Sequence, residues 1–89
     1  MLVRFSKKFA KQRDKAPKKI QVALNERLGI FYEDRFYSKL NNHALVGSYK
    51  GYRSINVSGD WRALYREIED ERDVIIFFDF LRTHSQLYK

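Results

Sequence analysis

The sequence has no cysteine, one proline (Pro17) and four glycines among its 89 residues. Without cysteine the chain has no disulfide, no thiolate metal ligand and no cysteine nucleophile. The longest strictly apolar run, residues 74–78, is five residues long, whereas a membrane-spanning helix needs about 20. The N-terminus also has no apolar stretch that could form the core of a signal peptide. The lack of cysteine does not indicate a compartment, but the lack of a long apolar run and of a signal-peptide core predicts a cytoplasmic protein that does not enter a membrane.

Acidic residues are scarce at the N-terminus. Residues 1–20 contain eight Lys and Arg and a single acid, Asp14, so this segment carries the whole net charge of +7. The rest of the chain has ten residues of each sign and is neutral. Such asymmetry predicts an anionic partner: nucleic acid, a membrane surface or an acidic protein. The candidate contacts are Lys7, Lys8, Lys11, Lys15, Lys18 and Lys19.

The length predicts one domain, residues 1–89. Residues 2–5 form a short apolar strand, and Ser6 is placed to cap a helix that ends near Lys15. Pro17 favours the start of a second helix, where its missing N–H costs nothing. The apolar stripe of this second helix comprises Ile20, Ala23, Leu24, Leu28 and Phe31.

Residues 35–51 have no clear period and are interpreted as irregular. Residues 52–57 and 61–68 predict a hairpin with a turn at 58–60, and residues 73–81 predict a buried strand. The segment Thr83–Gln86 has the form of a capping box before a last helical turn. The order β-α-α-β-β-β predicts a small α+β domain. In it a helical hairpin packs on one face of a curved antiparallel sheet.

Alternation along residues 61–68 separates two faces. Trp61, Ala63 and Tyr65 are expected to face the helices. Arg62, Leu64 and Arg66 are then expected on an open polar face. The alternative is that the two arginines form ordinary cross-strand ion pairs with Glu67 or Asp79.

Two segments carry a resemblance to a known family. Residues 43–65 read HALVGSYKGYRSINVSGDWRALY, and residues 83–88 read THSQLY. Together they resemble the RelE/ParE toxin superfamily, most closely its YafQ-like branch, over nearly the whole chain. The resemblance implies a RelE-like fold and an mRNA interferase without a cofactor. Such a toxin enters the A site of the 70S ribosome, binds mRNA and ribosomal RNA, and is neutralised by a cognate antitoxin encoded beside it.

The resemblance also implies site residues. YafQ-like members use three histidines and an aspartate, and the matching positions are His43, Asn56, Asp60 and His84. Asn56 departs from the pattern, because an amide cannot take up a proton at neutral pH. RelE relies on two arginines and a terminal tyrosine, which match Arg62, Arg82 and Tyr88. Lys50 and Arg53, from the block KGYR, join the basic segment as RNA-binding candidates.

These residue types suit metal-free cleavage of RNA. His84 is the leading general acid or base and Asp60 its partner, because activating a 2′-hydroxyl and protonating the leaving oxygen need titratable groups. Arg62 and Arg82 would hold the scissile phosphate. Tyr88 would stack on a nucleotide and His43 would orient it. Two histidines and no cysteine do not make a zinc-binding pattern.

Plainer interpretations remain open at each position. Thr83 and His84 cap the last helical turn, Asp60 is a common turn residue, His43 is a solvated loop residue, and the lysines form a solvated helix face. Two other functions fit the same resemblance. One is a ParE-like inhibitor of DNA gyrase without nuclease activity. The other is a catalytically weakened RNA-binding homologue, which Asn56 favours.

Overall fold

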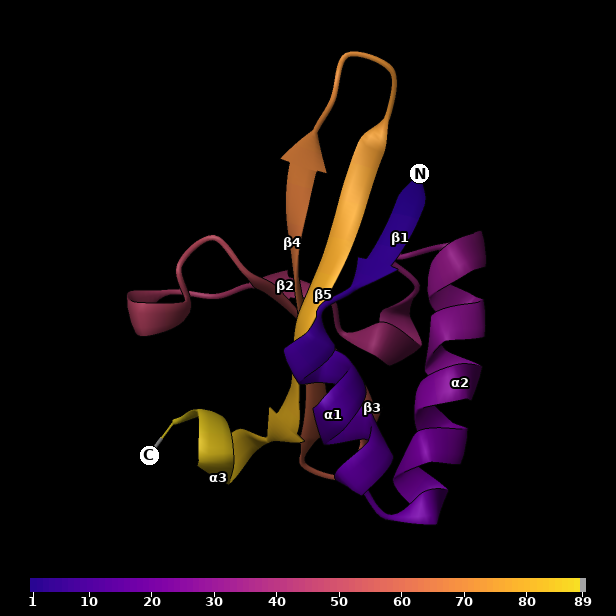
Figure 1. Ribbon diagram of the computed structural model, residues 1–89, viewed down its shortest axis with the longest axis vertical. Helices are drawn as coiled ribbons and strands as arrows, with labels where there is room; N and C mark the ends of the chain where they lie inside the picture. The colour runs from indigo at the N-terminus through magenta and orange to yellow at the C-terminus, as the bar shows by residue number, and fades with distance from the viewer. Residues whose placement is uncertain (89) are drawn as a thin grey trace.

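The computed structural model describes residues 1–88, which form three α-helices and a five-stranded sheet (Figure 1). In chain order the elements are β1 (Leu2–Phe5), α1 (Lys7–Lys15), α2 (Lys18–Glu33), the 3₁₀ turn η1 (Ser38–Leu40), β2 (His43–Ala44), the 3₁₀ turn η2 (Gly47–Tyr49), β3 (Arg53–Ser58), β4 (Trp61–Glu69), β5 (Val74–Thr83) and α3 (His84–Leu87). The predicted α+β class and element order are confirmed. The region 35–51, expected to be irregular, also contains the two-residue strand β2.

The strand order in the sheet is β1-β5-β4-β3-β2. Strands β2 to β5 pair with antiparallel neighbours, but β1 runs parallel to β5, with Leu2 opposite Ile75 and Phe5 opposite Phe78. The expectation of a wholly antiparallel sheet is therefore wrong at this edge, and the sheet is mixed. A four-residue apolar strand has no side-chain pattern that specifies its direction, which explains why the sequence did not reveal the pairing.

Helices α1 and α2 begin within one residue of the predicted positions, with α2 starting at Lys18 rather than at Pro17. Ser6 precedes α1, and its hydroxyl oxygen accepts a hydrogen bond from the Phe9 N–H at 2.9 Å. Pro17 immediately precedes α2, and its carbonyl accepts from the N–H groups of Ile20 and Gln21. The apolar stripe of α2 turns toward the sheet, where Ile20, Leu24 and Phe31 are buried.

Helix α1 closes the edge of β5 beyond the end of β1. The β1 pairing stops at Phe5, and the next N–H, that of Ser6, donates to the Phe78 carbonyl at 2.9 Å. Further along, the Leu81 N–H donates to the side-chain oxygen of Gln12 at 2.7 Å. A side chain of α1 thus takes the place of a missing strand at this point of the edge.

The core lies between the helices and one face of the sheet, and Phe78 is at its centre. The Phe78 ring is fully buried, and its centroid lies 5.2–5.7 Å from those of Phe5, Phe9, Phe31 and Tyr65. The other buried side chains of this cluster include Ile20, Leu24, Ile55, Val57, Ala63, Ile76 and Leu81. One residue of β5 therefore joins β1, both helices and β4.

Strand β5 has one residue more than β4 over the same stretch. Tyr65 pairs with Phe78 and Leu64 pairs with Phe80, so Asp79 has no partner on β4. Side chains alternate along a regular strand, and this β-bulge shifts the alternation by one residue. Phe78 therefore faces the helices, whereas Phe80 and Arg82 lie on the opposite face.

The bulged Asp79 is held by polar contacts. Its carboxylate accepts a hydrogen bond from the Tyr52 hydroxyl at 2.8 Å and lies 4.0 Å from the Lys8 ammonium. Burial acts to raise the pKa of Asp79, but hydrogen bonding by Tyr52 and Ser6 and the charges of Lys8 and Arg66 bring it below its ordinary value. Burial and the nearby carboxylate raise the pKa of Tyr52, so its hydroxyl keeps the proton that it donates.

Replacing Phe78 with alanine should destabilise the fold by about 3–5 kcal/mol, because it removes a buried ring and leaves a cavity at the centre of the core. The measurement is the free energy of unfolding in urea. Val46→Ala is the control, since Val46 is 84% exposed and should change little. A loss below about 1 kcal/mol for Phe78→Ala would contradict this account of the core.

The hydrogen bond between Tyr52 and Asp79 should affect how the stability of the fold depends on pH under acidic conditions. Because the pKa of Asp79 is lower in the folded state, the ionised carboxylate stabilises the protein above about pH 4, and this stabilisation is lost as the pH falls further. Tyr52→Phe keeps the ring but removes the donor. It should lower the melting temperature at pH 7 and flatten its decline below about pH 4. Parallel melting curves for the two proteins across this range would contradict the assignment.

Candidate functional site

The candidate site lies on the sheet face opposite α1 and α2. One row of this face contains Asn56 of β3, Arg62 of β4 and Arg82 of β5, which are direct neighbours in the strand register. The next row contains Ser54, Leu64 and Phe80. Figure 1 shows α3, the β3–β4 turn and the α1–α2 connection at the same end of the molecule, away from the tip of the β4–β5 hairpin.

Arg62 and Arg82 face each other across β4 and β5. Like charges in direct register repel each other, and within residues 1–88 neither guanidinium makes an ion pair with an acid. Arg62 therefore does not form the cross-strand ion pair with Glu67 or Asp79 that was the alternative. Arg62 instead donates to the Gly59 and Trp61 carbonyls at 2.8 and 3.0 Å. These bonds fix its guanidinium beside the β3–β4 turn.

The β3–β4 turn reaches the first residue of α3. Gly59 adopts a φ of 53°, which suits glycine, and the following Asp60 carbonyl accepts a hydrogen bond from the His84 N–H at 2.7 Å. The two sequence-predicted residues Asp60 and His84 thus lie together, joined by backbone. Both are exposed. Within residues 1–88 no hydrogen bond joins the Asp60 carboxylate to the His84 ring.

Helix α3 is a single turn held by a capping box, as predicted. The Thr83 hydroxyl oxygen accepts from the Gln86 N–H at 3.2 Å, and the Gln86 side-chain oxygen accepts from the Thr83 N–H at 3.0 Å. Leu87 is buried and anchors the turn. The His84 and Tyr88 rings then lie with their centroids 4.7 Å apart, so the geometry places the predicted proton-transfer residue beside the predicted stacking residue.

An aromatic cluster of Tyr49, Tyr52, Phe80 and Tyr88 covers part of this face. Tyr49 contacts the other three rings at centroid distances of 5.6–6.4 Å, and Tyr52 lies 5.4 Å from Phe80. Leu64 and Ser54 share this face and are buried. The expectation that Leu64 lies on a wet face is therefore wrong, although Arg66 is exposed as expected.

Sequence reasoning did not assign a role to Tyr49, Tyr52 or Phe80. The available signal was the spacing of Tyr49 and Tyr52 around the KGYR block, together with Phe80 two residues before Arg82. Seen separately, each is an ordinary apolar residue. Only the bulge and the loop that contains η2 bring them to one place.

Asn56 lies beside Arg62, and its side-chain oxygen is buried without a hydrogen-bond partner among residues 1–88. The position is thus inside the candidate site. Its side chain is an amide where the YafQ pattern has a histidine, so Asn56 can orient a group but cannot exchange a proton with it at neutral pH.

His43 lies apart from His84. It pairs with Ser54 at the β2 edge, and its Nδ1 lies 2.8 Å from the Asn41 carbonyl oxygen, so that nitrogen carries the proton when the bond forms. The ring is exposed and is on the same face as the arginines, but two strand spacings from β4, about 10 Å. The structure does not bring it into contact with Asp60, His84 or Tyr88.

The basic candidates differ in their surroundings. The six N-terminal lysines and Lys50 are exposed. Lys8 alone among the six approaches the aromatic cluster, with its ammonium 4.0 Å from the centre of the Phe80 ring. Arg53 is half-buried, donates to the Asn42 side chain at 2.8 Å and lies over the Phe36 ring. Its guanidinium therefore holds the loop before β2, on the helix-covered side of the sheet.

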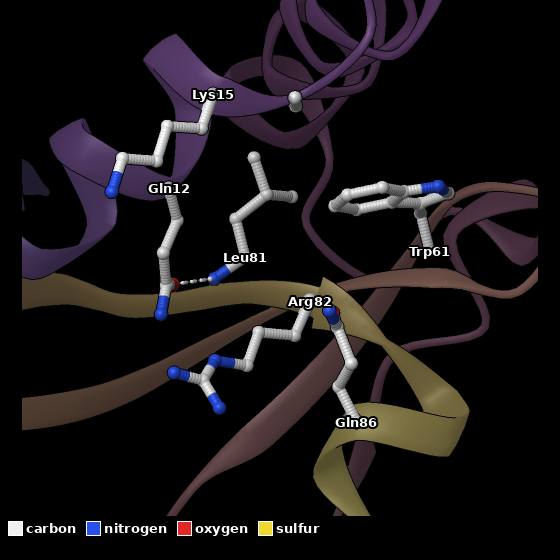
Figure 2. A pocket seen from close by; sticks show the side chains of 7 residues that line it. Gln12, Lys15, Trp61, Leu81, Arg82 and Gln86 are labelled. Atoms are coloured by element: carbon white, nitrogen blue, oxygen red, sulfur yellow. Dashed lines mark hydrogen bonds between the residues drawn. The ribbon is translucent and has the colours of Figure 1, made fainter.

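A cavity of 460 Å³ separates α1 from the end of the sheet, and Figure 2 shows the side chains around it. Lys15 and Gln12 form one wall, and the indole of Trp61 forms another. Trp61, interpreted from sequence as a core residue, packs against the core but is partly exposed here. The Arg82 side chain runs to the other side of β5 from Leu81, toward the site face (Figure 2).

The described part of the chain offers no group of three or more His, Cys, Asp or Glu side chains that could hold a metal ion. The helices in residues 1–88 are also too short or too polar to cross a membrane. The candidate site consists of Arg62 and Arg82, which have no acidic partner among residues 1–88, together with Asn56, Asp60, His84 and the aromatic rings.

Several solved structures with the same fold are bacterial toxins. YafQ from E. coli is 23% identical with a TM-score of 0.77, and the match covers 98% of this chain and 97% of that one. The toxin in the E. coli DinJ–YafQ toxin–antitoxin complex is 24% identical, with a TM-score of 0.74 and coverage of 98% and 96%. A YoeB/ParE toxin from Agrobacterium tumefaciens is 15% identical, with a TM-score of 0.74 and coverage of 94% and 99%. No curated protein sequence is significantly similar to the chain.

Structural similarity at such low sequence identity shows only the fold, whereas a match to a family model assigns the family. The model described as the bacterial toxin of type II toxin–antitoxin systems, YafQ, matches residues 1–89. The match includes the His84, Asp60 and twin-arginine region as well as the helical hairpin. This chain belongs to the YafQ family of toxins from type II toxin–antitoxin systems.

Proposed function

We propose that this toxin is a ribosome-dependent mRNA endonuclease, which cleaves RNA by attack of a 2′-hydroxyl on the adjacent phosphorus. The observation that carries the proposal is the pair Arg62 and Arg82, side by side and without an acidic partner among residues 1–88, next to Asp60, His84 and Tyr88. Two neighbouring unpaired cations repel each other, and a bound phosphate would relieve that repulsion.

Arg62 and Arg82 would stabilise the negative charge that develops on the phosphate in the transition state. In the transition state the phosphorus bears an extra bond to oxygen and its equatorial oxygens gain negative charge. Guanidinium groups stay protonated and offer several N–H donors in one plane, so Arg62 and Arg82 can stabilise those oxygens without themselves changing state. The hydrogen bonds from Arg62 to the Gly59 and Trp61 carbonyls support this role, because they orient its guanidinium before RNA arrives.

Two proton transfers complete the reaction. The 2′-hydroxyl loses its proton as its oxygen bonds to phosphorus, and the 5′-oxygen gains a proton as its bond to phosphorus breaks. The products are a 2′,3′-cyclic phosphate and a 5′-hydroxyl. Histidine as a residue type titrates near neutral pH and suits such transfers. We assign His84 as the main proton-transfer group, with Asp60 beside it. His43, two strands away, would contact the RNA farther along.

Tyr88 and the basic segment would bind rather than react. Tyr88 is about half exposed, and its ring would offer a face on which a base can stack. The exposed lysines of α1 and the start of α2 would attract ribosomal RNA through sequence-independent contacts with phosphates. A cognate antitoxin is the expected protein partner, in keeping with the family and with the DinJ–YafQ complex.

A translation extract programmed with one defined mRNA tests the nuclease. The wild-type toxin should produce cuts at codon-related positions, and His84→Ala should abolish them. Absence of cuts with wild-type toxin, or equal cutting by both proteins, would refute the proposal. Loss of supercoiling by purified DNA gyrase on addition of the toxin would instead favour the ParE-like function.

Arg62→Ala should lower the rate of cleavage about 100-fold, as expected for loss of one preorganised donor to a developing negative charge. The variant should lose less than about 1 kcal/mol of stability, because Arg62 is at the surface and bonds only to backbone. Single-turnover cleavage and urea unfolding measure the two effects. Arg72→Ala, at the exposed β4–β5 turn, is the matched control. A large stability loss with cleavage retained would show that Arg62 is structural.

Ribosome affinity should fall steeply with added KCl if the lysines bind RNA phosphates. A Lys7→Gln, Lys11→Gln double variant should reduce the slope of log affinity against log salt by about 1.5, which corresponds to two lost contacts. A Lys39→Gln, Arg72→Gln double variant makes the same change in net charge elsewhere and should leave the slope nearly unchanged. Equal slopes for the two double variants would refute a specific role of α1.

A further inference from the structure

Tyr49 links the body of the protein to its C-terminal turn. Its ring centroid lies 5.6 Å from that of Phe80 and 5.8 Å from that of Tyr88, with both pairs edge-on. Edge-to-face contacts at these distances are attractive and directional. Tyr49 thus contacts a ring of the interior strand β5 on one side and a ring of the candidate site on the other.

The loop that carries Tyr49 is braced by its own backbone. Gly47 and Gly51 flank the tyrosine with φ angles of 71° and 97°, a region in which residues with a side chain are strained. Two hydrogen bonds between residues three apart close the loop, from Lys50 N–H to the Gly47 carbonyl and from Tyr52 N–H to the Tyr49 carbonyl. The ring of Tyr49 is therefore presented from a fixed backbone.

The Tyr88 ring needs a contact outside α3 to fix its orientation. Tyr88 follows a helix of four residues, α3, and so short a helix depends on tertiary contacts for its stability. Tyr88 is 47% exposed. Among residues 1–88 the aromatic rings that it contacts are those of His84, at 4.7 Å, and Tyr49. Tyr49 is thus the contact that ties this ring to the rest of the aromatic cluster.

We propose that Tyr49 is a positioning residue, which holds the Tyr88 ring and through it the orientation of His84. The expected effect on cleavage rests on the proposed function of the site, whereas the restraint itself does not. Removal of the Tyr49 ring frees Tyr88 to take other rotamers. His84 then loses the neighbour that limits the motion of its own ring.

Kinetics test whether Tyr49 acts through Tyr88. Tyr49→Ala should lower kcat/KM for mRNA cleavage about 3- to 10-fold, the scale of one aromatic contact. Tyr49→Phe should retain cleavage, because the ring makes the contact. A Tyr49→Ala, Tyr88→Ala double variant should be no slower than Tyr88→Ala alone. Tyr37→Ala is the control, since Tyr37 is a 51% exposed tyrosine in the segment between α2 and η1. Unchanged cleavage in Tyr49→Ala, or losses that add in the double variant, would overturn the proposal.

Proton NMR of the histidines tests the restraint without RNA. The chain has two histidines, so without an affinity tag the ring signals of His84 and His43 are readily told apart. The Tyr88 ring current should shift the His84 signals, and both Tyr49→Ala and Tyr88→Ala should move them toward unfolded-chain positions. The His43 signals should stay in place and serve as the internal reference.

The spectroscopic result separates the two ideas. If the wild-type toxin cuts no mRNA but Tyr49→Ala still moves the His84 signals, the restraint stands and the nuclease proposal fails. If His84 signals are identical in wild type and Tyr49→Ala, the restraint is refuted whatever the cleavage result. Tyr49→Leu keeps apolar volume without a ring and should give the same shift, so it replaces Tyr49→Ala if that variant unfolds.

Discussion

The β-bulge at Asp79 is the constraint on which the two faces of the sheet depend. In a strand of regular alternation, Phe78, Phe80 and Arg82 would all point to one side. The extra residue lets Phe78 enter the helix-covered core while Phe80 and Arg82 reach the opposite face. Bulges are common beside functional sites, where they re-aim side chains. Here the bulge lets one strand serve both the core and the candidate site.

The site holds charges in an arrangement that costs stability. Arg62 and Arg82 are in direct register without an acid to offset them among residues 1–88, and Asn56 has a buried oxygen without a partner beside them. Elsewhere in the described chain the core is apolar and side chains cap α1 and α3, although Arg27 Nε on α2 is also buried without a hydrogen-bond partner. Departures from local consistency that cluster in one place are typical of functional sites rather than of scaffold.

Much of the fold could be predicted from sequence because its signals are local. Ser6, Pro17 and the Thr83–Gln86 capping box mark helix ends through residues next to them. Alternation correctly placed Ala63 and Tyr65 in the core. The direction of β1 was not predictable, since it depends on which strand lies beside it after the chain has folded. The bulge was also hidden, because residues 73–81 are apolar on both faces.

The site was predictable only through the family resemblance. Residues far apart in sequence, such as Asp60 and His84, meet because the β3–β4 turn reaches the end of β5, and no periodicity reports that meeting. The same holds for the separation of His43 from His84 and for the burial of Leu64 on the face opposite the helices. The chemical roles of these residues stay predictions. The structure adds their placement, and it adds Tyr49, which has no catalytic chemistry to attract notice.

The hydrogen bond from the Leu81 N–H to Gln12 limits where a strand of another chain can add to the sheet. An open strand edge invites a foreign strand to add to the sheet, in aggregation as well as in recognition. In the C-terminal half of β5 the hydrogen-bonding position at Leu81 is already occupied by the Gln12 side chain of α1. A strand from another molecule would have to displace Gln12 and lift α1. Strand addition is therefore steered away from this half of β5, toward the outer edges formed by β1 and β2.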